Sequence, residues 1–151
     1  MISGLFETHL AVSDLARSMD FYGRVLGLEL AHRDATRPVT FYWIGQRGGA
    51  MLGLWEKPPD QILPQHFAFR STPEQILEQS AAWLSERNLR GYNFLRDETG
   101  PMVFAWMPAV AIYFRDPDGH ELELIAMLDD APRPEEGVVS WERWRELVDR
   151  R

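Results

Sequence analysis

The sequence predicts an α+β fold made of two copies of a β-α-β-β-β module. Stretches with the alternating apolar residues of β-strands surround two stretches with helical periodicity. The same order of strand, helix and three strands occurs twice, and a proline-rich linker that begins at Pro58-Pro59 and runs to Pro64 separates the copies. We expect one domain over residues 1–128, with modules at about 5–56 and 64–128 and a C-terminal extension over 129–151.

The first module begins with a strand over residues 5–12. Alternation along this strand places Glu7, His9 and Ala11 on one face. Ser13 is a favourable N-cap for the helix that follows, and Gly27 is a favourable residue just beyond its end. Three more strands are expected, at residues 28–33, 39–44 and 50–56.

The second module repeats this order. Its first strand runs from His66 to Arg70 and places both of these residues on the face that carries Ala68. Thr72 and Gln75 have the spacing of a capping box, which predicts the start of the second helix. Three more strands are expected, at residues 92–96, 109–115 and 121–127.

The last two strands form a predicted hairpin around Asp116-Pro117-Asp118-Gly119. Proline presets its own φ, aspartate bonds to nearby backbone, and glycine accepts a positive φ, so this tetrapeptide is typical of a turn. Glu121 and Glu123 then share one face of the final strand. Two carboxylates in this position indicate either a solvent-facing edge or a polar cavity in which one of them binds a cation.

Two apolar segments lie outside the repeats. The segment 97–108 is too apolar for a solvated turn, and we expect its large side chains to be covered by the pocket, the other module or a second subunit. These side chains are Met102, Phe104, Trp106 and Met107. After an acidic, proline-rich link, Ser140 is expected to cap a helix over 141–150 that docks on the domain through Trp141, Trp144 and Leu147.

Composition narrows the classes of function. The 151 residues suffice for one domain with a proper core. The net charge of −7 argues against nucleic-acid binding, and the absence of cysteine excludes disulfides and thiolate metal sites. No apolar run approaches the roughly 20 residues that span a bilayer. We therefore expect a cytoplasmic protein that binds neither nucleic acid nor membrane.

Three residues on predicted strands form a candidate metal site. They are His9, His66 and Glu123, and each module contributes at least one. Two imidazoles and one carboxylate suit a divalent transition metal and leave positions open for substrate or water. Each residue alone is more often an ordinary core or surface residue, but their joint placement on a duplicated frame favours a shared site.

At this point the sequence resembles the vicinal oxygen chelate superfamily, which includes glyoxalase I, extradiol dioxygenases, fosfomycin resistance enzymes and bleomycin-binding proteins. The matching pieces are HLAVSDLARSMDFYGRVLGLEL, HFAF and YFRDPDGHELEL, within residues 3–128. The resemblance implies a cup-shaped, eight-stranded mixed sheet with a metal inside, held by His9, His66 and Glu123. It also implies a small-molecule substrate and a homodimer.

Departures from the family pattern bear on the reaction. Glyoxalase I uses a second glutamate late in its first module, and the corresponding position here is Gly53, which makes glyoxalase I activity doubtful. The three-ligand pattern is closer to that of fosfomycin resistance enzymes, and Tyr113 matches their substrate-contacting tyrosine. The threonine that those enzymes carry two residues after the first histidine is Ala11 here. A dioxygenase would also need a histidine base. His32 and His120 are available, but we expect His120 to be exposed to solvent after the turn.

Alternation along the strands indicates which other side chains face the cup. The candidate substrate-binding residues are Tyr113, Arg115, Trp43, Trp55, Arg70 and Trp106. Ordinary core packing explains the tryptophans of the first module as well as substrate binding does. The two arginines either pair with a substrate carboxylate or phosphonate or balance the charge of nearby acids.

The sequence supports two hypotheses of function. The first is a metal-dependent enzyme, in which manganese, iron, zinc or nickel acts as a Lewis acid on a small oxygen-bearing substrate. Such an enzyme would be a lyase, a transferase or a dioxygenase, and no catalytic residue is assigned. The second is a non-catalytic binding protein of the bleomycin-resistance kind, in which the ligand set has no chemical role.

Overall fold

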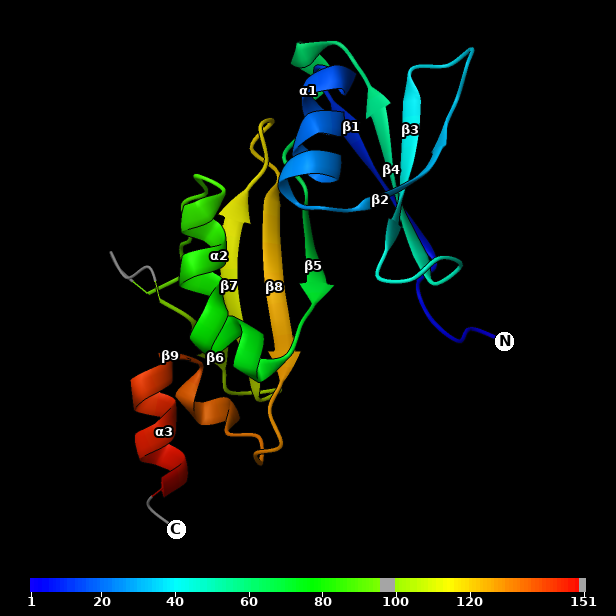
Figure 1. The fold of residues 1–151 in the computed structure, drawn as a ribbon. Coiled ribbons are helices and arrows are strands. Elements are labelled where there is room, and N and C mark those ends of the chain that lie inside the picture. Colours follow the sequence, from blue (N-terminus) through cyan, green and yellow to red (C-terminus); the bar gives the residue numbers. More distant parts are fainter. Residues whose placement is uncertain (96–99, 150–151) are drawn as a thin grey trace. The chain divides into compact units, whose positions relative to one another are not determined.

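The computed structural model describes residues 1–95 and 100–149, which fall into two compact units (Figure 1). The first unit comprises residues 1–65 together with the turn 116–120, and the second comprises residues 66–115 and 121–151. The turn between the last two predicted strands therefore belongs with the first half of the chain. No helix among the described residues has the length and apolarity needed to cross a bilayer.

The first unit contains a four-stranded sheet in the order β1-β4-β3-β2. The edge strand β1 (Glu7–Val12) is parallel to its neighbour β4 (Ala50–Glu56), whereas β3 (Val39–Ile44) and β2 (Glu29–Arg33) continue the sheet in antiparallel fashion. One helix, made of α1 (Leu15–Met19) and the π-helical turns of η1 (Asp20–Val25), follows β1. Residues with less than 2% exposure, Leu10, Val12, Leu52 and Leu54, form the core on one face of the β1–β4 pair.

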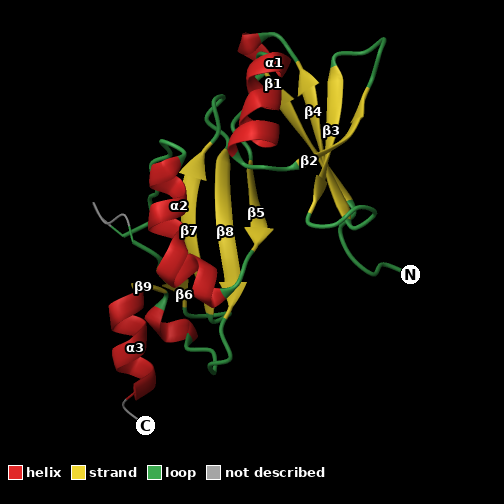
Figure 2. Cartoon of the chain, viewed as in Figure 1, coloured by secondary structure: helices red, strands yellow, loops and turns green. Residues whose placement is uncertain are grey.

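The second unit repeats this architecture (Figure 2). Its sheet has the order β5-β8-β7-β6-β9, and the first four positions match the strand order of the first unit. The strands are β5 (His66–Arg70), β6 (Met102–Phe104), β7 (Ala109–Arg115), β8 (Glu121–Met127) and β9 (Val138–Ser140). The helix comprises η3 (Gln75–Gln79) and α2 (Ser80–Glu86), and single 3₁₀ turns η2 (Pro59–Gln61) and η4 (Pro134–Glu136) lie in the connections. The predicted duplication of a β-α-β-β-β module is confirmed.

One predicted strand of the second module is in the wrong place. Of residues 92–95, Tyr92 alone pairs, in an isolated bridge with Tyr113. The Asn93 side chain accepts from the Leu95 amide (2.8 Å) and donates to the Gly100 carbonyl (2.7 Å), so it bends the chain where a strand was expected. The second strand of the module is instead β6, inside the segment 97–108 that was predicted to be a loop, of which residues 97–99 lie outside the described part of the chain.

The two helix starts differ in how well the sequence predicts them. Thr72 Oγ1 accepts from the Gln75 amide and Gln75 Oε1 accepts from the Thr72 amide, both at 3.2 Å, which confirms the capping box. The predicted cap at Ser13 is wrong by one residue. Asp14 has the extended backbone of an N-cap, and its carboxylate accepts from the Arg17 amide at 2.9 Å.

The C-terminal extension packs on the second unit through a strand and a helix. β9 pairs with β6, and α3 (Trp141–Asp149) follows at once, with the Ser140 hydroxyl accepting from the Arg143 amide at 3.2 Å as predicted for a cap. Trp144 is fully buried and its indole N–H donates to Asp130 at 2.9 Å. The extension is thus part of the sheet and core of the second unit.

Candidate metal centre

His66 and Glu123 form the best-defined polar pair of the second unit. They lie on the neighbouring parallel strands β5 and β8, where Ala68 is directly opposite Glu123 and His66 is two residues further back. The His66 Nε2 atom is 3.1 Å from Glu123 Oε2. The imidazole side chain is 45% exposed, whereas the carboxylate side chain is 4% exposed. The pair therefore has a buried anionic end and an accessible imidazole end.

The other nitrogen of His66 determines what this pair can bind. His66 Nδ1 is 3.0 Å from the main-chain carbonyl of Glu121. A carbonyl only accepts hydrogen bonds, so Nδ1 carries a proton, and Nε2 is the nitrogen that faces the Glu123 carboxylate. A proton or a metal cation between Nε2 and the carboxylate would satisfy both atoms. A backbone acceptor on the far nitrogen is also the usual support of a metal-binding histidine.

The Glu123 carboxylate itself lacks sufficient partners for a buried anion. Its Oε1 atom has no hydrogen-bond partner among the described residues. Burial raises the pKa of Glu123, and the Tyr113 hydroxyl and His66 oppose that rise only in part. A buried carboxylate is costly unless it is paired or binds a metal, so this oxygen is a second indication of a cation site.

Tyr113 completes the cluster of the second unit. It lies on β7 directly opposite Glu123, and its ring stacks on His66 with centroids 5.3 Å apart and an interplanar angle of 26°. Burial raises the pKa of Tyr113, and the neighbouring Glu123 raises it further. The tyrosine is therefore a neutral hydroxyl donor beside the carboxylate.

His9 lies in the first unit, on β1, with a different set of partners. Its Nδ1 accepts a hydrogen bond from the Trp55 indole N–H at 3.1 Å, and its Nε2 contacts the Glu7 carboxylate. Gly53 is directly opposite His9 on β4. A Cβ at Gly53 would be 2.9 Å from the imidazole ring, so the ring occupies the space that any side chain at this position would need.

The two units have the same strand register around their histidines but different residues at the matching position. In the second unit, Glu123 is two residues beyond the strand partner of His66. In the first unit, the residue two beyond the strand partner of His9 is Trp55. Trp55 thus has the same register relative to His9 as Glu123 has relative to His66, and it too bonds the imidazole.

These donor atoms fit a divalent metal in chemistry and in spacing. Nitrogen and oxygen ligands with bonds of about 2.1 Å at a right angle are about 3 Å apart, close to the separation of His66 Nε2 and Glu123 Oε2. Within either unit, the described residues bring no three histidine, aspartate or glutamate side chains together as a metal would require. The His66–Glu123 pair would supply only part of a ligand set, and both its role as a ligand pair and its grouping with His9 stay predictions.

The remaining candidate substrate residues are scattered. Trp55 contacts His9, and Trp43 lies on β3 opposite Met51. Arg115 pairs with Glu121 at 3.4 Å and stacks over Tyr92, which matches the interpretation that it balances acids. Trp106, in the turn after β6, is 58% exposed.

Arg70 has a setting of its own in the second unit. It borders an open cavity of about 630 Å³, whose other lining residues are Ala68, Ser71, Ile125, Ala126 and Met127. Because strand alternation places Arg70, Ala68 and His66 on the same face of β5, this cavity lies further along the strand on the face that carries His66. The position is compatible with a substrate contact and stays a prediction.

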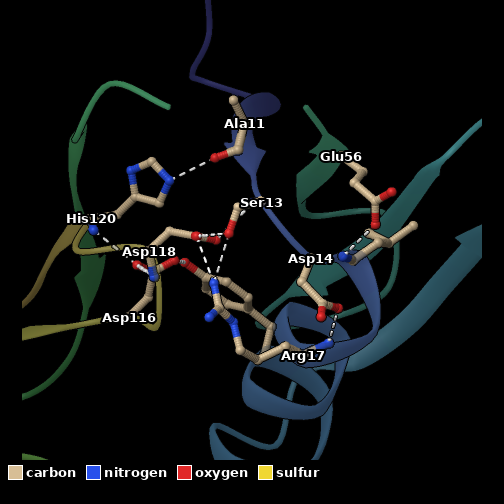
Figure 3. Close-up of polar contacts among 10 residues, drawn as sticks. Ala11, Ser13, Asp14, Arg17, Glu56, Asp116, Asp118 and His120 are labelled. Carbon is tan, nitrogen blue, oxygen red and sulfur yellow. Dashed lines mark hydrogen bonds and ion pairs between the residues drawn. The ribbon is translucent and has the colours of Figure 1, made fainter. Parts of the chain in front are cut away.

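The expectation that His120 is exposed is wrong, because the residue is fully buried in the first unit (Figure 3). Its Nδ1 accepts from the Gln65 amide at 3.0 Å, and its Nε2 donates to the Ala11 carbonyl at 2.8 Å. Both ring nitrogens therefore bond main-chain groups and neither is free to act as a base. His32 is exposed on β2 and stacks on Phe41.

The turn 116–120 holds further residues that the sequence did not single out as interacting. Asp116 accepts from the His120 amide and from the Tyr22 hydroxyl, both at 2.8 Å. Asp118 accepts from the Ser13 amide at 3.1 Å and from Arg17 at 2.7 Å (Figure 3). The two aspartates of the DPDG motif thus anchor the turn on the residues after β1, a role that turn propensity alone does not reveal.

Comparison with known proteins gives a consistent picture. A family model described as the Glyoxalase/Bleomycin resistance protein/Dioxygenase superfamily matches residues 4–124. The chain is 32% identical over 130 residues to metallothiol transferase FosB of Staphylococcus saprophyticus subsp. saprophyticus, covering 82% of this chain and 77% of that protein.

Solved structures show the same fold. An integron cassette protein, HFX_CASS4, from the mobile metagenome of Halifax Harbour sewage outfall, superposes with a TM-score of 0.71 at 34% identity, covering 83% of this chain and all of that one. The fosfomycin resistance protein FosX from Listeria monocytogenes gives a TM-score of 0.59 at 22% identity, with 90% and 99% coverage.

Proposed function

Because the chain belongs to the Glyoxalase/Bleomycin resistance protein/Dioxygenase superfamily, the vicinal oxygen chelate family indicated by its motifs, we propose that it is a divalent-metal-dependent enzyme acting on a small oxygen-bearing substrate. His66 and Glu123, together with His9, would hold the ion. The observation that carries this proposal is the buried Glu123 carboxylate, whose Oε1 has no hydrogen-bond partner among the described residues and whose Oε2 lies 3.1 Å from His66 Nε2. A cation is the simplest partner for the carboxylate and the imidazole nitrogen.

The residues around the pair have distinct roles in this proposal. When bound, the metal supplies Lewis-acid polarisation of substrate oxygens. The Glu121 carbonyl orients His66 by fixing the proton on Nδ1. Tyr113, stacked on His66 and opposite Glu123, offers its hydroxyl to a substrate oxygen that develops negative charge.

A transferase is the reaction class with most support. The relative that is 32% identical is named a metallothiol transferase. This chain has no cysteine, so any thiol in the reaction would have to be a separate small-molecule substrate. Glyoxalase I chemistry is disfavoured, since Gly53 offers no carboxylate and its position is filled by the His9 ring.

Metal analysis tests the site. Protein purified without added metal or chelator is examined by elemental analysis and then titrated with manganese, iron, zinc and nickel. We expect one ion per chain in the wild type and its loss in Glu123→Ala and His66→Ala. The matched control is Glu142→Gln on α3, which should retain metal. Stoichiometric metal in Glu123→Ala would overturn the site.

Activity tests the reaction class. The metal-loaded protein is incubated with a low-molecular-weight thiol and a small epoxide, and free thiol is followed with time. Thiol loss that needs both the metal and Glu123 supports a transferase. A protein that takes up no metal but binds a small molecule tightly would instead favour the non-catalytic binding hypothesis.

A further inference from the structure

Glu7 is the nearest carboxylate to the imidazole of His9. The two residues are separated by one position on β1, so their side chains emerge on the same face of the strand. The Glu7 carboxylate contacts His9 Nε2 directly. Both side chains are partly exposed, at 34% for Glu7 and 46% for His9, so the atoms that meet are within reach of an ion from solution.

Among the described residues, Glu7 makes an ion pair with His9 and with no other residue. No lysine or arginine among the described residues pairs with Glu7, although other exposed acids of the first unit, such as Glu29 with Arg47, have such partners. Gly53, directly opposite His9, has no side chain that could compete with Glu7 for the imidazole. Glu7 therefore presents its charge to one group, the nitrogen of a proposed metal ligand.

Trp55 determines which nitrogen of His9 carries the ring proton. An indole N–H can only donate, so the 3.1 Å contact with His9 Nδ1 makes that nitrogen an acceptor and leaves the ring proton on Nε2, toward Glu7. The Nε2 proton thus occupies the position between a nitrogen and a carboxylate oxygen that a bound cation would take. When Nε2 coordinates instead, the ring proton belongs on Nδ1, and the hydrogen bond from Trp55 has to be given up.

We propose that Glu7 is a further carboxylate ligand of the ion that His9 binds. This inference rests on the proposed metal-dependent function and extends its ligand set from two histidines and one carboxylate to two histidines and two carboxylates. The first module thereby contributes a carboxylate from β1 in place of one at Gly53. Trp55 holds the His9 ring in the metal-free protein, and binding of the ion has to displace its hydrogen bond to Nδ1.

Cobalt(II) titration of the metal-free protein tests the proposal, because cobalt reports its ligand number through its visible absorption as well as its affinity. Glu7→Gln preserves the size of the side chain and removes the anionic donor. We expect it to weaken Co²⁺ binding by about tenfold or more and to alter the visible spectrum. The matched control is Glu29→Gln on β2, which makes the same change in net charge and should leave both readouts unchanged.

Trp55→Phe gives a second, opposite readout. It removes the hydrogen bond that metal loading must break while retaining an aromatic ring, so we expect Co²⁺ to bind more tightly. Circular dichroism confirms that each variant is folded, and the exposed position of Glu7 makes folding insensitive to the change.

Two outcomes would contradict the proposal in different ways. If Glu7→Gln binds Co²⁺ as tightly as the wild type or more tightly, Glu7 is at most a competitor of the metal for His9 and not a ligand. If His9→Ala and Glu123→Ala also bind Co²⁺ like the wild type, the proposed metal site itself is wrong, and the role of Glu7 is refuted with it.

Discussion

At the level of single residues, Gly53 shows how a missing side chain can determine a site. A Cβ built at this position would be 2.9 Å from His9 Cδ2 and 3.0 Å from Phe41 Cε1. Contacts this short force one of the rings to move. The backbone of β4 beside His9 therefore has no room for a side chain, and glycine at this position leaves the space that the His9 ring occupies.

We predict that Gly53→Ala weakens metal binding more than it weakens the fold. The His9 ring is partly exposed and can rotate away, so overpacking should cost about 1–3 kcal/mol of unfolding free energy or less. The displaced imidazole should lower Co²⁺ affinity by at least about tenfold. Calorimetric titration and urea unfolding measure the two effects. Gly4→Ala, where nothing lies within 4 Å, is the control, and wild-type affinity in Gly53→Ala would show that the ring position is unimportant.

Asp116 is a residue whose charge opposes folding. Burial raises its pKa above the usual value, and His120, the Tyr22 hydroxyl and two backbone amides lower it only in part. The folded protein therefore holds the Asp116 proton more tightly than the unfolded chain. The stability that this residue contributes is present below its unfolded pKa of about 3.8 and is lost as the pH rises through its raised pKa.

The substitution Asp116→Asn should therefore stabilise the protein more, relative to the wild type, as the pH rises. An asparagine oxygen can still accept from the amides of Asp118 and His120, while the buried charge is removed. We expect the unfolding free energy of the variant, minus that of the wild type, to increase from pH 3.8 upward and to level off above the raised pKa. Urea unfolding at a series of pH values measures this difference, and a constant difference across the series would contradict it.

At the level of elements, the C-terminal strand and helix are integral to the second unit. β9 extends the sheet beside β6, and Trp144 of α3 is fully buried. Its indole N–H donates to Asp130, so the large side chain is both packed and hydrogen-bonded. Helix α3 contains none of the proposed ligands, so its structural role is separate from metal binding.

Trp144→Ala should destabilise the protein by about 3–5 kcal/mol, because it removes a fully buried aromatic ring and leaves Asp130 without its donor. Trp141→Ala, at a partly exposed position on the same helix, should cost much less. Both variants, when folded, should bind Co²⁺ like the wild type. Thermal unfolding and cobalt titration together check this, and a small cost for Trp144→Ala would mean that the extension contributes little to stability.

The elements also show where sequence patterns are informative and where they are not. Alternation and capping chemistry are local, so the duplicated module, the Thr72–Gln75 capping box and the Ser140 cap could be predicted. Strand β6 could not, because it has only three residues and lies between the nearby β7 and the strand β9, which is distant in sequence. His120 was misassigned for the same reason, since its partners at Ala11 and Gln65 are distant along the chain.

The candidate site was predicted to a similar extent. Strand periodicity placed Glu7 on the face of His9, and Glu123 and Tyr113 on the faces that the structure shows to meet His66. The interaction of Trp55 with His9 depends on the register between β1 and β4, which a single sequence does not specify. The grouping of His66 with Glu123 could thus be predicted, whereas the contact between Trp55 and His9 required the structure.

At the level of the whole molecule, the proposed ligands are divided between the two halves of a duplicated fold. His9 and Glu7 belong to the first unit, and His66 and Glu123 belong to the second. Each unit has an apolar core of its own, made of buried side chains distant from the proposed ligands in sequence. Metal should therefore act as a ligand of the folded chain that adds to its stability, and not as a condition for folding.

This division leads to a prediction about thermal stability. A ligand that binds only the folded state at a free concentration 100-fold above its Kd adds about 2.7 kcal/mol. For a chain of this length, that corresponds to a rise in Tm of roughly 5–10 °C. Scanning calorimetry of the metal-free and Co²⁺-loaded protein measures the shift. If one ion uses ligands from both units, His9→Ala and Glu123→Ala should each remove most of the shift. A full shift in His9→Ala together with none in Glu123→Ala would restrict the site to the His66–Glu123 pair, and Glu142→Gln should retain the full shift as the control.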